Sequence, residues 1–110
     1  MSYVHDARVA LQCELDDRDA QCPDELVDLY TLLVLTSGTG TDLEDVHDAW
    51  STWTARSRPD HRSLIPFDDL AADIQELDAP YRDAICAAAE ALRPSLPPGT
   101  FEVEHLGRTS

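Results

Sequence analysis

The sequence predicts an all-α fold: a compact domain of four to five helices with a short extended C-terminal tail. Two observations predict it. Apolar residues keep a helical spacing through long stretches of the chain, and a T-D-L-E segment has the form of a capping box that starts a helix. A chain of 110 residues is large enough to bury a core of its own, so we expect a single domain over residues 1–110.

The first helix is predicted over residues 3–16. Four apolar residues recur there at helical spacing, namely Val4, Ala7, Leu11 and Leu15. The polar segment D-D-R-D-A-Q-C-P-D follows and ends the helix.

A second helix is predicted to start at Pro23. Proline is accepted in a first helical turn, and Asp24 and Glu25 suit the positive end of the helix dipole. The segment T-L-L-V-L-T alone would also fit a strand. We favour a buried central helix because the apolar phase is continuous from Leu26 to Leu35 and S-G-T-G then supplies a glycine stop.

A third helix is predicted from residue 42 to near Ser57, before Pro59. In the T-D-L-E box, the Thr41 hydroxyl accepts a hydrogen bond from the Glu44 backbone N–H while the Glu44 carboxylate reaches back. The inward stripe of this helix holds Leu43, Val46, His47, Trp50, Trp53 and Thr54.

The segment R-P-D-H-R-S-L-I-P-F is predicted as a loop that Leu64, Ile65 and Phe67 pin to the core. One helical phase then continues across Pro80, and Pro80 predicts a break near Asp78, with Asp78 capping the new helix. The residues that share this phase are Leu70, Ile74, Leu77, Tyr81, Ala84, Ile85, Ala88 and Leu92. In the tail over residues 94–110, F-E-V-E-H-L alternates like a short strand, and the alternative is an extended segment that lies along the surface.

The charge of the chain excludes some partners. Its 22 acidic and 8 basic side chains give a net charge of −14, which argues against direct binding to nucleic acid or to anionic membranes. The N-terminus has no signal-peptide pattern and no apolar run approaches a membrane span, so we expect a soluble, cytoplasmic protein. Cys13, Cys22 and Cys86 fit no zinc or disulfide spacing, and we expect reduced, mostly buried thiols.

Three segments in order resemble a known family: H-D-A-W at 47–50, H-R-S-L-I-P-F-D-D-L at 61–70 and E-L-D-A-P-Y-R-D-A-I at 76–85. Together they resemble the ryanodine-receptor repeat (RyR) domain, in a small prokaryotic or phage version, over roughly residues 24–95. The glycine- and aromatic-containing segment that the family often carries after its tryptophan is replaced here by A-R-S-R-P. The resemblance implies a sensor of nucleotide-derived signals in phage defence or anti-defence.

The candidate ligand-binding residues lie at the end of the third helix and in the loop after it. Trp50 and Trp53 would stack a flat base, and Trp53 is the nearer of the two to the arginine-rich loop. Arg56, Arg58 and Arg62 would hold phosphate, and His61 would add a hydrogen bond. The alternatives are that the tryptophans are core residues, that Arg56 complements the helix dipole, and that the arginines pair with nearby carboxylates.

Other polar residues have simpler interpretations. His47 lies on the apolar stripe, which favours a structural histidine bonded to a backbone carbonyl. No metal-binding spacing and no nucleophile motif occurs, so we expect no metal, no cofactor and no catalytic residue. The acidic pairs at 16–17 and 68–69 are expected to be solvated.

These observations predict a non-enzymatic, RyR-like module that binds a nucleotide-derived small molecule, to sense or sequester an immune signal. The alternative is an acidic protein–protein interaction module, including a DNA-mimic inhibitor, with a protein as its partner. The sequence does not predict the oligomeric state.

Overall fold

The computed structural model describes residues 2–92, which form an all-α fold and confirm the predicted fold class. Within this range there is no β-strand. The α-helices are α1 (Tyr3–Asp17), α2 (Asp24–Thr36), α3 (Leu43–Ala55), α4 (Ala72–Gln75) and α5 (Ala79–Leu92), and the 3₁₀ turns are η1 (Gly38–Gly40), η2 (Phe67–Asp69) and η3 (Glu76–Asp78). The predicted tail over 94–110 lies outside the described residues.

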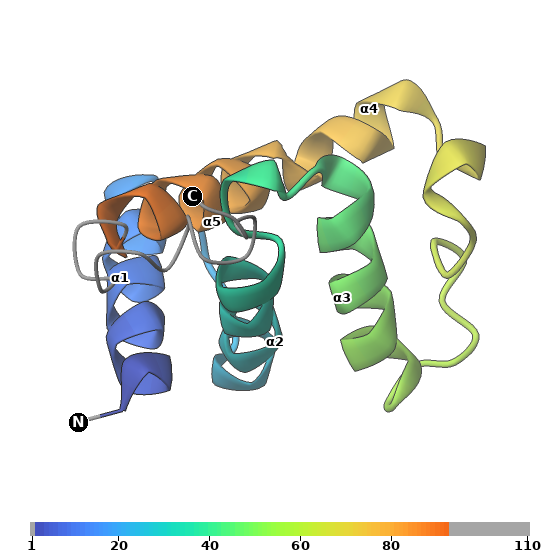
Figure 1. The fold of residues 1–110 in the computed structure, drawn as a ribbon. Coiled ribbons are helices and arrows are strands. Elements are labelled where there is room, and N and C mark those ends of the chain that lie inside the picture. The colour runs from blue at the N-terminus through green and yellow to red at the C-terminus, as the bar shows by residue number, and fades with distance from the viewer. Residues whose placement is uncertain (1, 93–110) are drawn as a thin grey trace, which may run out of the picture.

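Figure 1 shows α1, α2 and α3 standing side by side, with α5 lying across the ends of α1 and α2. Helix α5 packs against α1, α2 and η1, and α2 packs against both α1 and α3. The fully buried residues come from four helices, so one core joins them. They include Ala7, Leu11, Leu15, Val27, Val46, Ala84, Ile85 and Ala88.

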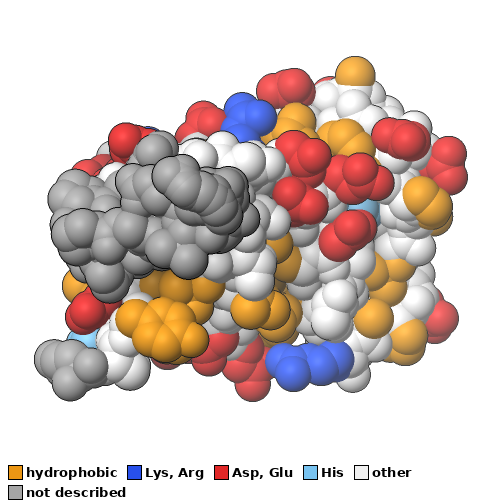
Figure 2. Space-filling model, viewed as in Figure 1, with side chains coloured by type: hydrophobic (Ala, Val, Ile, Leu, Met, Phe, Trp, Pro, Cys, Tyr) orange, Lys and Arg blue, Asp and Glu red, His pale blue; other side chains and the backbone are white. Residues whose placement is uncertain are grey.

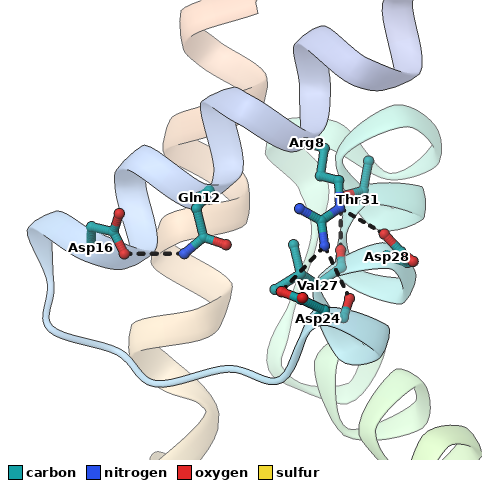
Figure 3. Close-up of polar contacts among 7 residues, drawn as sticks. All are labelled: Arg8, Gln12, Asp16, Asp24, Val27, Asp28 and Thr31. Atoms are coloured by element: carbon teal, nitrogen blue, oxygen red, sulfur yellow. Dashed lines mark hydrogen bonds and ion pairs between the residues drawn. The ribbon is translucent and has the colours of Figure 1, made fainter.

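Polar contacts tie α1 to the start of α2 (Figure 3). The Arg8 guanidinium donates to the Asp28 carboxylate over 2.7 Å and to the Asp24 backbone carbonyl over 3.3 Å. Within α2 the Thr31 hydroxyl donates to the Val27 carbonyl over 2.7 Å, which satisfies a buried polar group. Arg8 thus adds surface contacts between two helices whose buried residues already pack together.

The predicted capping box of α3 is displaced by one residue. Asp42, not Thr41, is the N-cap: its carboxylate accepts from the Asp45 N–H over 2.9 Å, and the Asp45 carboxylate accepts from the Asp42 N–H over 3.1 Å. The Thr41 hydroxyl donates instead to the Gly38 carbonyl over 2.9 Å. Aspartate caps a helix as well as threonine does, and η1 already uses the Thr41 hydroxyl.

The helical prediction for the second segment is confirmed, but α2 is less buried than predicted. Leu32 is 55% exposed and Leu35 is 37% exposed, because no described element covers that side of the helix. After α2 the chain turns at Gly38, whose φ of 57° lies in the left-handed region that favours glycine. The predicted glycine stop is confirmed.

The helical phase predicted from residue 70 to residue 92 is interrupted. Between α4 and α5 the chain forms the 3₁₀ turn η3, so the break predicted near Asp78 is confirmed. A 3₁₀ turn advances fewer residues per turn than an α-helix, which shifts the facing of the side chains. Ile74 and Leu77 are therefore 36% and 64% exposed, contrary to their predicted place in the core. The predicted helix cap is not seen, because the Asp78 side chain forms no hydrogen bond with a described residue.

Three other residues are more exposed than predicted. Val4 is 45% exposed near the start of α1, and Cys13 is exposed on α1. All three cysteines are free thiols, as predicted. Ile65 is 41% exposed, and it anchors its loop through its backbone carbonyl and not through its side chain.

Candidate functional site

A groove of about 510 Å³ lies between α2 and α3. The other walls come from α4, η3 and the start of α5, together with Gln21, His61, Ser63 and Leu70. Most of its lining is aromatic or aliphatic, and its volume lies within the range of small-molecule sites, about 300–1,000 Å³. We call this feature the groove.

One wall of the groove is a series of aromatic rings. The His47 ring stacks on Trp50 with 5.7 Å between ring centres, and the His61 ring meets Trp50 edge-on at 5.1 Å. Trp50 is half-buried: it packs against the core and also lines the groove. Packing in the core and contact with a ligand are therefore compatible roles for Trp50.

Trp53 follows one turn later on α3 and lines the same wall. Its indole N–H donates to the Glu25 carboxylate over 3.2 Å, and Arg56 donates to the same carboxylate oxygen over 3.0 Å. The side chains of Arg56 and Glu25 are 59% and 73% exposed, so this ion pair adds little to stability. The Glu25 carboxylate joins the Trp53 indole and Arg56 at the edge of the groove, while the Trp53 ring packs partly against the core.

His47 is 3% exposed and holds the loop against α3. Its Nε2 lies 2.7 Å from the Ile65 carbonyl and 3.3 Å from the Ser51 hydroxyl. Because a carbonyl only accepts, Nε2 carries the proton, and Nδ1 is the acceptor in the neutral ring. The prediction of a structural histidine bonded to a backbone carbonyl is confirmed.

His61 is oriented by its own turn. Its Nδ1 accepts from the Ser63 N–H over 3.0 Å, and its backbone N–H donates to the Arg58 carbonyl over 3.0 Å. The neutral ring therefore carries its proton on Nε2, so this nitrogen is a donor. No described residue accepts from it.

The inner part of the groove brings together Tyr30 from α2, Asp78 from η3 and Tyr81 from α5. The two tyrosine rings lie 5.8 Å apart, and the Tyr81 hydroxyl donates to the Gln21 carbonyl over 2.7 Å. No described residue forms a hydrogen bond with the Tyr30 hydroxyl or with the Asp78 carboxylate.

The charges of these inner groups follow from their surroundings. Burial raises the pKa of Asp78 above its ordinary value, and attraction to His47 opposes the shift. Burial also raises the pKa of the Tyr30 phenol above its usual range, and Cys22, Asp78 and Tyr81 add to this effect. The Tyr30 hydroxyl is therefore protonated at neutral pH and available as a donor.

With the groove described, the chain can be compared with known proteins. Residues 2–90 match DUF7701, a domain of unknown function. The chain belongs to the DUF7701 family. No curated protein and no solved structure matches it. The DUF7701 match includes α1, whose residues Ala7, Leu11 and Leu15 are part of the buried core.

The groove contains three of the six predicted ligand-binding residues. Trp50, Trp53 and His61 line it, whereas Arg56, Arg58 and Arg62 do not. Arg58 and Arg62 are exposed and form no ion pair with a described residue. Figure 2 shows arginine side chains at the C-terminal end of α3 and acidic side chains around its N-terminal end, an arrangement that suits the helix dipole.

The sequence prediction missed Tyr30, Asp78 and Tyr81 as site residues. The sequence predicts only that Tyr30 belongs to a buried helix, that Asp78 caps a helix and that Tyr81 shares the apolar phase of the last helix. The one available signal was a hydroxyl-bearing ring within an otherwise apolar helix, because such a group needs a partner when buried.

No group of three or more His, Cys, Asp or Glu side chains in residues 2–92 is arranged to hold a metal ion. Asp16, Asp17, Asp68 and Asp69 are exposed, as predicted. No helix within the described range has the length and apolar character needed to cross a membrane.

Proposed function

We propose that this DUF7701 domain is a non-enzymatic module that binds a nucleotide-derived small molecule in the groove. The observation that carries the proposal is a groove of about 510 Å³ whose walls are largely aromatic or aliphatic and whose inner end holds two polar groups, on Tyr30 and Asp78, without hydrogen-bond partners among the described residues. Ligand sites combine an apolar lining with a few such groups. The resemblance of residues 24–95 to the RyR domain supports the same ligand class, with a role in sensing or sequestering an immune signal.

The base of the ligand would lie along the wall formed by Trp50, Trp53 and His61. Both tryptophans pack partly against the core. Trp50 already has His47 stacked on it and His61 edge-on, whereas Trp53 has no ring contact with a described residue and donates its indole N–H to Glu25. Trp53 is therefore the better platform. Stacking of a base on such a ring contributes roughly 1–3 kcal/mol to binding.

The phosphates would lie outside the groove, near Arg58 and Arg62. Arg62 stands between His61 and Ser63, which both line the groove, and the Arg58 carbonyl accepts from the His61 N–H. A ligand that leaves the groove past this turn meets two guanidinium groups that no described carboxylate neutralises. Guanidinium groups bind phosphate bidentately, so this turn favours a ligand with an anionic end.

The test is calorimetric titration of the protein with cyclic dinucleotides and ADP-ribose-type molecules. We expect Arg62→Ala to weaken binding by about tenfold to a hundredfold, since a charge-assisted contact contributes roughly 1.5–3 kcal/mol. Arg82→Ala is the matched control, because Arg82 pairs with Asp83 on α5 and does not line the groove. Absence of binding to every compound, or equal weakening by both substitutions, would contradict the proposal.

A second candidate is the acidic interaction module, which the acidic surface around the N-terminal end of α3 favours (Figure 2). Its partner would be a basic protein, and the contact would weaken with added salt. Replacing Asp42, Glu44 and Asp48 with their amides should abolish such binding and leave nucleotide binding unchanged. The opposite result would favour the groove.

A further inference from the structure

Tyr30 is a buried side chain whose hydroxyl reaches the groove without a protein partner. It is 1% exposed, it lines the groove, and its hydroxyl forms no hydrogen bond with a described residue. Among the described residues, the Thr54 hydroxyl is the side-chain group that is fully buried without a partner, so the Tyr30 oxygen keeps some solvent access from the groove that it lines. Polar groups inside folded proteins nearly always have a partner, and here a ligand in the groove can supply it. Tyr81 makes the contrast clear, because its hydroxyl is satisfied by the Gln21 carbonyl at 2.7 Å.

Asp78 supplies a second unpartnered group at the same end of the groove. It lines the groove and is half-buried, and it belongs to the turn directly before the helix that carries Tyr81, whose ring lies 5.8 Å from that of Tyr30. Since a carboxylate only accepts hydrogen bonds, its occupant must be a donor. An anionic group would be repelled there, so the phosphate end of a ligand does not fit this position.

The two groups together specify a ligand edge. Asp78 requires an N–H donor, and the protonated Tyr30 hydroxyl can donate to a neighbouring ring nitrogen or carbonyl. Both conditions are met by the amino-bearing edge of a nitrogen heterocycle, as in adenine or guanine. The aromatic wall of Trp50 and Trp53 lies along the same groove, where it can cover the flat face of such a ring.

We propose that Tyr30 and Asp78 are the specificity-determining residues of the groove and read the amino-bearing edge of a purine or similar heterocycle. This inference rests on the proposed function and adds the chemistry that selects the base. It places the base edge at the inner end of the groove and the phosphates at the turn that carries Arg62.

The experiment compares nucleosides that differ by one amino group. Adenosine is paired with purine riboside, and guanosine with inosine, in NMR titrations that follow the indole N–H signals of the two tryptophans. In at least one pair, we expect the amino-bearing member to bind about tenfold to a hundredfold more tightly, the value of a hydrogen bond to a charged group.

Two substitutions complete the test. Asp78→Asn should remove most of this preference, and Tyr30→Phe should weaken binding of the preferred nucleoside by about twofold to tenfold, the value of a neutral hydrogen bond. Asp73→Asn and Tyr3→Phe are the matched controls, because both residues are exposed and lie outside the groove lining. Both should leave binding unchanged.

The outcomes separate this inference from the proposed function. Equal binding within both pairs, or preferences that survive Asp78→Asn and Tyr30→Phe, would overturn the inference while the groove remained a nucleoside site. Failure of all four nucleosides and of the nucleotide panel to bind would overturn both.

Discussion

At the residue scale, Tyr30 and Tyr81 carry the same ring and differ in what their hydroxyls contact. We expect Tyr81→Phe to lower the free energy of unfolding by roughly 0.5–1.5 kcal/mol, because it removes the hydrogen bond to the Gln21 carbonyl. Tyr30→Phe should leave it unchanged or raise it slightly, since no described contact is lost. Urea denaturation of both variants measures this. A large loss in Tyr30→Phe would mean that its hydroxyl supports the fold.

Asp78 gives a prediction about pH. Burial raises its pKa in the folded protein, so the ionised form is disfavoured there relative to the unfolded chain. The stability associated with protonated Asp78 is present below the ordinary pKa of aspartate and is lost as the pH rises through the raised folded-state value.

Asp78→Asn should therefore stabilise the protein at neutral pH, and the gain should vanish in acid below the ordinary aspartate pKa. Because the side chain is only half-buried, we expect a modest rise in Tm of about 2–4 °C, given that 1 kcal/mol corresponds to about 4–8 °C in a domain of this size. Thermal unfolding followed by circular dichroism at several pH values measures it. A gain that is independent of pH would contradict the assignment to burial of the charge.

At the element scale, the start of α3 tests which residue is the cap. Asp42→Ala should cost roughly 0.5–2 kcal/mol of unfolding free energy, because the Asp45 N–H then loses its acceptor. Glu44→Ala is the control: Glu44 is exposed and outside the capping box, so it should change stability by less than about 0.5 kcal/mol. Chemical denaturation compares the two. A larger loss of stability in Glu44→Ala than in Asp42→Ala would show that Thr41 and Glu44 form the capping box.

Helix positions could largely be predicted from the sequence, whereas the choice between neighbouring caps could not. Thr41 and Asp42 are both good N-cap residues, and the deciding contact is the bond from the Thr41 hydroxyl to the Gly38 carbonyl in η1. Periodicity likewise identified α5 but placed Leu77 inside, because a short 3₁₀ turn within a helical stretch leaves no clear mark in the apolar pattern.

At the scale of the whole molecule, α1 is part of the core. Its residues Ala7, Leu11 and Leu15 are fully buried, and α5 packs along it. A variant that starts at residue 21 should not fold, since burying each leucine contributes roughly 1.5–3 kcal/mol to a domain stability of about 5–15 kcal/mol. Far-ultraviolet circular dichroism would show the loss of helix. A cooperative thermal transition in this variant would show that the core does not need α1.

The candidate site could be predicted only in part, because some of its residues are brought together by packing between distant parts of the chain. Trp50, Trp53 and His61 are close in sequence, so a local pattern indicated them. Tyr30 and Asp78 are far apart in the chain, and they share the groove only because η3 packs beside α3 and α5 packs against α2. Local spacing contains no information about that packing.

The central claim is that the groove binds a nucleotide-derived ligand through its aromatic wall. The most direct measurement is an NMR titration of the full chain with ADP-ribose that follows the indole N–H of Trp53 together with the backbone amides of Tyr30, His61 and Asp78. We predict saturable shifts at all four positions, which Arg62→Ala displaces to higher ligand concentration. Unchanged signals at these positions, or shifts confined to residues outside the groove, would contradict the account.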